Sequence, residues 1–397
     1  MQLIDRGCVV ALALAGCSPN GGVVFEQTGS EGGGGSTSAA PPTSGGGQES
    51  GGDGSLSGLP PPPSTLPTTT PGSDDSSGGD GGDGDSGGTQ PPTGTVIPAH
   101  GKWRWLAAGQ APADWASRAF EDGGWPEGQA PFGEGGDAAT LVDPGAAAAG
   151  MFARARFEAA GPVDRLALYL RRGDGAAVYV NGTEVLRTNL PDGPLAAAED
   201  ELGGDEVQRY LQFVVPGAAV QAGENVVAVA VRRAQAGAAG LTFDMQVDVH
   251  DAAAASQVKA QWRTRTYGGE YSDKNVGAAW IETEAGAFVR TLIVWGEVRR
   301  DNLVAWNAKS DGDVVDAVTS ATRGSHRTNA ASWDLRDTNG QTVGAGSYVL
   351  QFEFTEDDSN KGADPGPRLA VPFVVGAGDS VTVMKSGNYR DVSVLAP

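Results

Sequence analysis

The chain has 397 residues, among them 61 glycines and 24 prolines, and carries a formal net charge of −21 at pH 7. Because glycine and proline are this frequent and 39% of the residues are hydrophobic, part of the chain cannot bury a core, and the folded part must be shorter than the chain. No cluster of lysine and arginine is present that could neutralise phosphates, so nucleic acid is not an expected partner.

The start of the chain is typical of an exported protein. A short apolar run leads into Leu14-Ala15-Gly16-Cys17, and a run of this length is an export signal and not a spanning helix. The stretch resembles the signal peptide and lipobox of bacterial lipoproteins. That resemblance implies removal of residues 1–16, a lipid on Cys17, and attachment to a membrane of the bacterial cell envelope. By the same resemblance, Ser18 after the lipidated cysteine is compatible with sorting to the outer membrane. Cys8 would leave with the signal, so the mature chain would have no free thiol.

Residues 17–97 are predicted to be a disordered linker that follows the lipidated cysteine. They contain Gly/Ser runs, a proline run and Asp-Gly repeats, and they have no lysine or arginine. Gly/Ser runs behave as flexible coil, proline runs as stiffer spacers, and like charges extend the chain. We expect this segment to hold the folded part away from the membrane.

Residues 98–250 alternate hydrophobic and polar side chains with the period of a β-strand. Leu166, Leu168 and Leu170 fall on one face of "DRLALYLRRG", and "LTFDMQVDV" at 241–249 reads as a half-buried strand. Asn181-Gly182 between two such runs predicts a tight hairpin turn. We therefore predict an antiparallel β-sandwich here.

The same region carries a family resemblance. The motifs are "WRW" at 103–105, "FEDGGW" at 120–125, "APFG" at 130–133, "GDGAAVYVNG" at 173–182 and "GENVVAV" at 223–229. Together they resemble the galactose-binding-like jelly-roll domains of secreted bacterial proteins. The resemblance implies a module that binds glycan or protein ligands, in which Trp103, Trp105, Trp115 and Trp125 are candidates for a sugar platform. The alternative is that these tryptophans cap the core.

Residues 251–257 are predicted to be a connector and residues 258–397 a second β-sandwich. In "SYVLQFEFTED" the side chains of Tyr348, Leu350, Phe352 and Phe354 share one face. The stretch from Trp333 to Tyr348 resembles the Ig-like domain of flagellar hook-capping proteins. As a whole, 258–397 resembles a periplasmic family of unknown function; the residues that carry this resemblance are Tyr271, 274–282, 288–292, Trp295, Gly296, Trp306 and 316–326.

Reactive residues are few and do not form a recognisable catalytic set. His100, His250 and His326 are far apart in sequence, so neither zinc nor any other metal is expected. Ser325 and His326 are adjacent but lack a nucleophile-elbow motif. Asp357, Asp358 and Asp364 lack the regular spacing of a calcium loop, so we interpret them as solvated loop residues. No catalytic residue is predicted, and the protein is not expected to be an enzyme.

One segment resembles a modification site. Asp316, Thr319, Ser320, Ala321 and Thr322 fit the pattern that bacterial flavin transferases modify: Asp, two free positions, Thr or Ser, Gly or Ser, Ala, then Thr or Ser. The resemblance implies a covalent FMN on Thr322 Oγ. The alternative is that these hydroxyls bind nearby backbone groups and stabilise a bend between strands.

Two functions remain from the sequence. The first is a lipid-anchored envelope protein without a cofactor, whose non-catalytic β-sandwich modules bind glycan or protein ligands. The second is a flavin carrier for envelope electron transfer, with FMN on Thr322 and a flavin transferase as partner.

Overall fold

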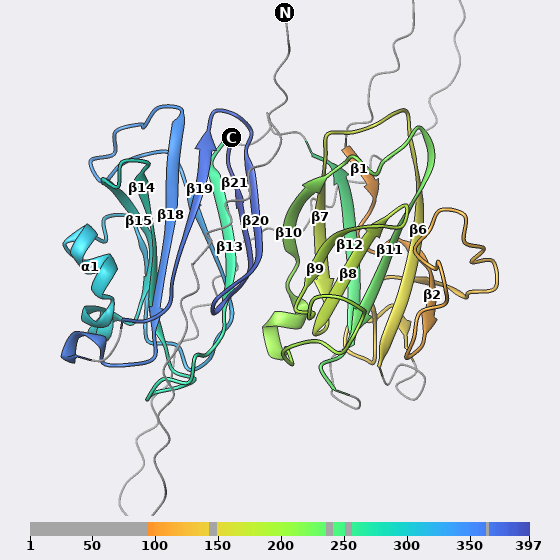
Figure 1. Cartoon of the computed structure of the whole chain (residues 1–397), viewed down its shortest axis with the longest axis horizontal. Coiled ribbons are helices and arrows are strands. Elements are labelled where there is room, and N and C mark those ends of the chain that lie inside the picture. The colour runs from red at the N-terminus through yellow and green to blue at the C-terminus, as the bar shows by residue number, and fades with distance from the viewer. Residues whose placement is uncertain (1–93, 143–148, 236–240, 251–255, 363–364) are drawn as a thin grey trace, which may run out of the picture. The chain divides into compact units, whose positions relative to one another are not determined.

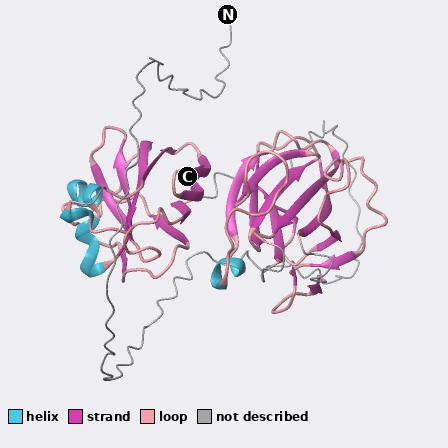
Figure 2. Cartoon of the chain, turned by 60° about the horizontal axis from the view of Figure 1, so that its bottom comes forward, coloured by secondary structure: helices cyan, strands magenta, loops and turns pink. Residues whose placement is uncertain are grey.

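The computed structural model describes residues 94–142, 149–235, 241–250, 256–362 and 365–397. These residues are mostly β-strand and form four sheets, which make two β-sandwiches (Figure 1, Figure 2). The prediction of an all-β protein with two sandwiches is therefore confirmed. The signal peptide, Cys17 and residues 17–93 of the predicted linker lie outside the described residues. None of the helices described is long and apolar enough to cross a membrane.

The first module consists of two sheets of six strands each. One has the order β10-β7-β12-β4-β5, with β1 also paired to β12, and the other the order β3-β2-β6-β11-β8-β9. The strands of the first sheet are β1 (Gly94–Ile97), β4 (Phe132–Gly133), β5 (Thr140–Leu141), β7 (Arg165–Arg172), β10 (Leu211–Pro216) and β12 (Thr242–Val249). Those of the second are β2 (Lys102–Ala107), β3 (Glu127–Gln129), β6 (Gly150–Ala159), β8 (Gly175–Val180), β9 (Thr183–Thr188) and β11 (Gly223–Arg232). A 3₁₀-helix, η1, spans Gly204–Gln208.

The core of this module lies where the sequence predicts it. Leu166, Leu168 and Leu170 of β7 are buried and belong to the same hydrophobic cluster as the alternate valines of β11. Between β8 and β9, Asn181 and Gly182 have φ values of 51° and 90°. Both values lie in the left-handed region that a type I′ turn requires, which confirms the predicted hairpin.

Two features of the first module differ from the predictions. Strand β1 pairs with β12, so the last four residues of the predicted linker belong to this sandwich. Strand β12 is buried on both faces over most of its length and is not half-buried. Its Asp244 is fully buried, and hydrogen bonds from the Tyr210 hydroxyl (2.5 Å) and the His100 backbone N–H (3.1 Å) compensate for the loss of water.

The second module has a sheet with the order β17-β13-β21-β20 and a second sheet with the order β16-β15-β14-β18-β19. The four-stranded sheet contains β13 (Val258–Thr264), β17 (Thr328–Trp333), β20 (Ser380–Ser386) and β21 (Tyr389–Leu395). The five-stranded sheet contains β14 (Val276–Thr283), β15 (Phe288–Trp295), β16 (Val318–Ser320), β18 (Gly346–Thr355) and β19 (Arg368–Val375). The predicted core face of β18 is confirmed, since Tyr348, Leu350, Phe352 and Phe354 are all buried.

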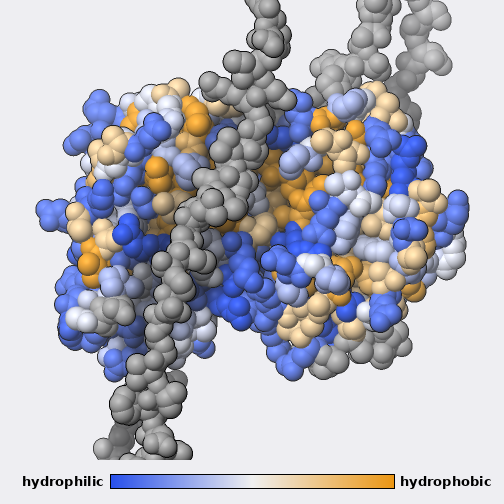
Figure 3. Space-filling view, in the orientation of Figure 1, coloured by the Kyte–Doolittle hydropathy of each residue, from blue (hydrophilic) through white to orange (hydrophobic). Residues whose placement is uncertain are grey.

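Short helices cover the outer face of the five-stranded sheet. They are η3 (Glu297–Asn302), α1 (Val304–Ser310) and η4 (Ser359–Lys361), and α1 lies beside β15 (Figure 1). Trp306 of α1 is fully buried against Trp280 and Val294. Elsewhere the face drawn in Figure 3 carries hydrophilic side chains over most of its area, with apolar patches between them.

Candidate functional site

The loops of the second module gather at one end of the five-stranded sheet. The pairing register places Trp295, Ser320, Gly277, Thr355 and Arg368 at this end. We call it the loop end. The segments 265–275, 296–303, 321–327 and 356–362 begin or finish there, so residues far apart in sequence become neighbours.

The 316–322 segment forms the outermost strand of this sheet. Its residues Val318–Ser320 make β16, which pairs in parallel with the last three residues of β15. Asp316 precedes the strand with a φ of 53°, and its carboxylate lies 2.9 Å from the Arg290 guanidinium. The Gly296 backbone N–H donates to the Ser320 carbonyl at 2.8 Å. The segment is thus an edge strand that leads into a short extended stretch.

The hydroxyls of this segment do not stabilise a bend. Within residues 256–362, no hydrogen bond joins the side-chain oxygen of Thr319, Ser320 or Thr322 to a backbone group, and Ser320 Oγ is buried without a partner. The Thr322 hydroxyl instead accepts a long hydrogen bond (3.4 Å) from Arg299 Nη1 of η3. The bend interpretation therefore lacks the contacts that it requires.

Thr322 is half-exposed and directly precedes a residue that is held firmly. Arg323 exchanges two backbone hydrogen bonds with Asn275, at 2.9 and 3.0 Å. Its side chain turns inward, with the guanidinium 4.2 Å from the centre of the Trp295 ring. Burial disfavours the charged form and lowers the pKa of Arg323 to about 9. Thr322 is thus held at the surface, while its neighbour packs inside.

The surroundings of Thr322 fit an attached FMN phosphate. Arg299 is exposed and its guanidinium already contacts the hydroxyl that would carry the phosphate, and guanidinium groups bind phosphate oxygens well. Val298, next to Arg299 in η3, is 85% exposed, and Val318 of β16 is 42% exposed. Exposed apolar side chains of this size on both flanking elements are compatible with an aromatic ring system at this surface.

His326, Asp357 and Asp358 lie at the loop end, where their side chains make hydrogen bonds and ion pairs within the second module. His326 Nε2 is 2.5 Å from Glu356 Oε1, and its Nδ1 is 2.8 Å from Thr264 Oγ1. Asp357 accepts hydrogen bonds from the Tyr267 hydroxyl and the Glu270 backbone N–H, and Asp358 pairs with Lys361. Asp364 lies outside the described residues. Among the residues that the structure places, no group of three or more His, Cys, Asp or Glu could hold a metal ion.

Three of the four candidate tryptophans of the first module are buried and cannot form a sugar platform. Trp103, Trp115 and Trp125 are only 1%, 6% and 8% exposed, so the expectation of a platform is wrong for these three. Trp105 is half-buried, with its ring centre 5.8 Å from that of Phe132. These side chains pack on the sandwich because their large apolar surfaces are more stable away from water. The alternative of packing on the sandwich therefore holds for the buried three: Trp103 lies in the core between the sheets, and Trp115 and Trp125 lie in a separate hydrophobic cluster.

The comparison with protein families bears on the second module. Residues 255–365 match the family model described as "Predicted periplasmic protein (DUF2271)". This DUF2271 region is less than half of the chain, and it contains the whole 316–322 segment together with Arg299 and His326. The description agrees with the predicted envelope location at the level of a periplasmic family.

Several solved structures of glycosidases are distantly similar to the chain. A glycosyl hydrolase family 2 member from Bacteroides cellulosilyticus has 10% identity and a TM-score of 0.26, over 76% of this chain and 37% of that one. A β-glucuronidase from Bifidobacterium dentium has 13% identity and a TM-score of 0.26, over 75% and 50%. The exo-chitosanase CsxA from Amycolatopsis orientalis has 16% identity and a TM-score of 0.29, over 76% and 36%.

This chain therefore spans half or less of the length of these enzymes. At such low identities and TM-scores, the likeness supports no inference about activity. No curated protein matches the chain.

Proposed function

We propose that this protein is an electron carrier of the bacterial envelope that holds one FMN as a phosphoester on Thr322 Oγ. One observation carries the proposal: the half-exposed Thr322 hydroxyl contacts the Arg299 guanidinium at the end of an edge strand. The hydroxyl belongs to a segment whose residues fit the pattern of flavin transferase substrates. The glycan-binding function of residues 98–250 is not preferred, because three of its four candidate tryptophans are buried.

Access to the segment supports attachment by a second enzyme. Strand β16 has three residues and is the outermost strand of its sheet, so one of its edges pairs with no other described strand. Asp316, Thr319 and Ala321 are exposed, and Ser320 and Ala321 are small. A transferase could therefore bind the segment from the outside, and an unpaired strand edge is a common binding surface for another protein.

The attachment reaction balances without a further reactant. The Thr322 Oγ–H bond breaks, and Oγ bonds to the phosphorus on the FMN side of FAD. The bond from that phosphorus to the bridging oxygen of the pyrophosphate breaks, AMP leaves, and the hydroxyl proton passes to a base of the transferase. Attached in this way, FMN supplies one- and two-electron transfer.

The residues of this chain would position the attached FMN, and none of them is proposed to catalyse a step. Arg299 would donate hydrogen bonds to the phosphodiester, and the contact between Arg290 and Asp316 would fix the start of the segment. A lipid on Cys17 would anchor the protein to the membrane, while the predicted linker would hold the folded modules away from it and let the second module reach redox partners. The lipid anchor, the outer membrane and the redox role are parts of this proposal.

In-gel fluorescence tests the attachment. The full chain is co-expressed with a bacterial flavin transferase, beside Thr322→Ala, Thr322→Ser and the neighbouring hydroxyl control Ser325→Ala. We expect a fluorescent band for the parent chain, Thr322→Ser and Ser325→Ala, and none for Thr322→Ala. Fluorescence that persists in Thr322→Ala would contradict the proposal, as would a dark parent chain beside a transferase that labels a known substrate.

A further inference from the structure

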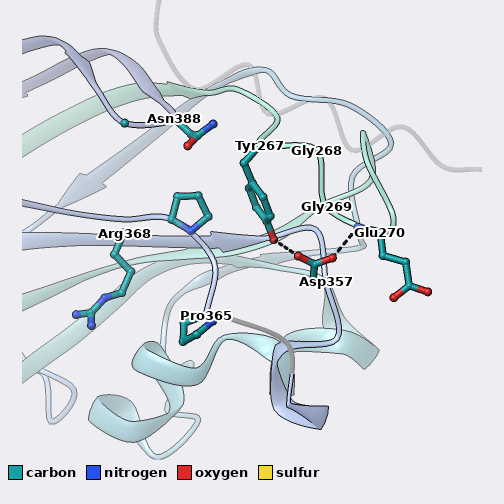
Figure 4. A pocket seen from close by; sticks show the side chains of 10 residues that line it. Tyr267, Gly268, Gly269, Glu270, Asp357, Pro365, Arg368 and Asn388 are labelled. Atoms are coloured by element: carbon teal, nitrogen blue, oxygen red, sulfur yellow. Dashed lines mark hydrogen bonds between the residues drawn. The ribbon is translucent and has the colours of Figure 1, made fainter. Parts of the chain in front are cut away.

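A second feature of the loop end is a pocket whose lining does not include Thr322. It has a volume of about 670 Å³, within the range of small-molecule sites. Its lining includes Tyr267, Glu270, Asp357, Pro365, Arg368 and Asn388 (Figure 4). Arg368 begins β19, the edge strand opposite β16, whereas Asp357 follows β18 and Tyr267 and Glu270 lie in the loop that leads into β14.

Tyr267 is held in place before any ligand arrives. Its hydroxyl donates to Asp357 Oδ2 (2.9 Å), lies 3.0 Å from Thr355 Oγ1 and accepts from the Glu356 backbone N–H (2.8 Å). Its ring also packs against Phe354, with the ring centres 5.8 Å apart. A tyrosine fixed at both its ring and its hydroxyl gives a rigid aromatic surface, and such preorganisation lowers the entropic cost of binding.

Hydrogen-bond donors and acceptors surround the Tyr267 ring (Figure 4). In Figure 4, Asn388, Arg368 and Pro365 lie around Tyr267 on one side, and Asp357 lies on the other. Asn388 uses one amide N–H on the Thr266 carbonyl, which leaves its oxygen and its second N–H. Within the described part of the chain, the Arg368 guanidinium and the Glu270 carboxylate make no hydrogen bond or ion pair, so both can bind a ligand.

We propose that this pocket binds a neutral carbohydrate, as a free sugar or as a unit of a polysaccharide. A sugar ring has apolar C–H faces, which suit the Tyr267 ring and the prolines, and a rim of hydroxyls that donate and accept hydrogen bonds. The pocket offers carboxylate acceptors, guanidinium donors and an amide that does both. Glu270 and Asp357 outnumber Arg368, so the resulting negative charge disfavours anionic ligands.

This inference goes beyond the flavin carrier and does not depend on it. The two sites share no residue: Thr322 follows the edge strand β16, and the pocket is lined by other loops and by the start of β19. Thr322→Ala should therefore bind sugars as the parent chain does, which separates failure of one proposal from failure of the other.

Ligand-observed NMR with the full chain tests the pocket. Maltose, cellobiose, lactose and N,N′-diacetylchitobiose are titrated singly, and glucuronate is the anionic probe. The variants are Arg368→Gln and Glu270→Gln, both at exposed positions where folding should persist, and the matched control is Arg300→Gln outside the pocket.

We expect at least one neutral sugar to bind. Its affinity should fall about tenfold in Arg368→Gln and Glu270→Gln, because each loses a hydrogen bond that involves a charged group, and should stay unchanged in Arg300→Gln. Electrophoresis in gels that contain a polysaccharide distinguishes the two sources of the sugar. If the protein binds the disaccharides but is not retarded in the gel, the ligand is a free sugar; if it is retarded, the ligand is a unit of a polysaccharide. The proposal is overturned if no neutral sugar binds, if the pocket variants bind as the parent does, or if glucuronate binds more tightly than the neutral sugars.

Discussion

Three neighbouring hydroxyl residues at the end of β16 differ in what their side chains contact. Thr319 is exposed, Ser320 Oγ is buried without a partner, and Thr322 contacts a guanidinium. A phosphodiester carries one negative charge, so a fixed cation beside it stabilises the product of attachment. Thr322 is therefore the best placed of the three to carry a phosphate.

Arg299 should assist attachment without supporting the fold. In Arg299→Gln we expect FMN attachment to slow by about three- to tenfold, a modest effect because the guanidinium is exposed and screened by solvent. Thermal unfolding should not change. The measurement is the time course of in-gel fluorescence at limiting transferase, with Arg300→Gln as the neighbouring control. Equal slowing in both variants would indicate a general effect of surface charge.

Glu356 makes the stability of the second module depend on pH. Burial alone would raise the pKa of this carboxyl group, but hydrogen bonds from the Gly269 backbone, His326 and Thr266 outweigh burial and hold the pKa below its usual value. A carboxyl group with a lowered pKa in the folded state stabilises the fold above its unfolded pKa of about 4.3. That contribution is lost as the pH falls through the lowered folded value.

Glu356→Gln should therefore be less stable than the parent near neutral pH, by about 1–3 kcal/mol, because buried donors lose a charged acceptor. The difference should shrink as the pH falls below about 4. Urea unfolding of parent and variant across this range provides the test, with the exposed Glu270→Gln as control. A difference that stays constant with pH would show that ionised Glu356 does not stabilise the fold.

At the scale of elements, one close contact between β14 and β15 shapes the loop end. Gly277 of β14 pairs directly with Trp295 of β15, and a Cβ on Gly277 would lie 2.1 Å from the Trp295 ring. The indole donates to Asn275 Oδ1 at 2.8 Å and packs under the Arg323 guanidinium. Only glycine leaves the ring this space, so the position of Trp295 depends on Gly277.

Gly277→Ala should lower the free energy of unfolding by about 1–3 kcal/mol, because the added methyl overpacks a buried site. It should also slow FMN attachment, since displacing Trp295 disturbs the support of Arg323. Chemical denaturation followed by tryptophan fluorescence measures the first effect. Gly324→Ala is the control, because a Cβ there meets nothing within 4 Å and its backbone needs no glycine. Equal stability of both variants would refute the packing argument.

Long strands with clear alternation could be predicted from the sequence, whereas the short strand β16 and the burial of β12 on both faces could not. The core faces of β7 and β18 follow directly from the spacing of Leu166 to Leu170 and of Tyr348 to Phe354. Strand β16 has only three residues and gives no periodic signal. The burial of Asp244 in β12 depends on Tyr210 and His100, which are distant in sequence.

The candidate attachment site was predictable only in part, for the same reason. The 316–322 pattern is local, so the sequence alone is enough to select Thr322 as the candidate attachment residue. Arg299 and the pocket around Tyr267 are brought to the loop end by strand pairing, and their residues share no local motif. The adjacent Arg299 and Arg300 do not by themselves predict a phosphate-binding residue, because an arginine pair occurs equally on a solvated surface.

At the scale of the whole molecule, the prediction concerns membrane attachment. Cys17→Ser should move the protein from the membrane fraction to the soluble fraction, because the lipid anchor implied by the lipobox would be lost. Fractionation with gel mobility measures this. Ser18→Ala is the control and should stay with the membranes. If Cys17→Ser fractionates as the parent does, with unchanged mobility, the protein is not a lipoprotein of this kind.

The most direct test of the flavin carrier is the intact mass of the full chain after export together with a bacterial flavin transferase. We predict a gain equal to one FMN less one water, located by peptide mapping to Thr322 and absent from Thr322→Ala. An unmodified mass, beside a transferase that modifies a known substrate, would contradict the account and leave the 316–322 segment as an edge strand without a cofactor.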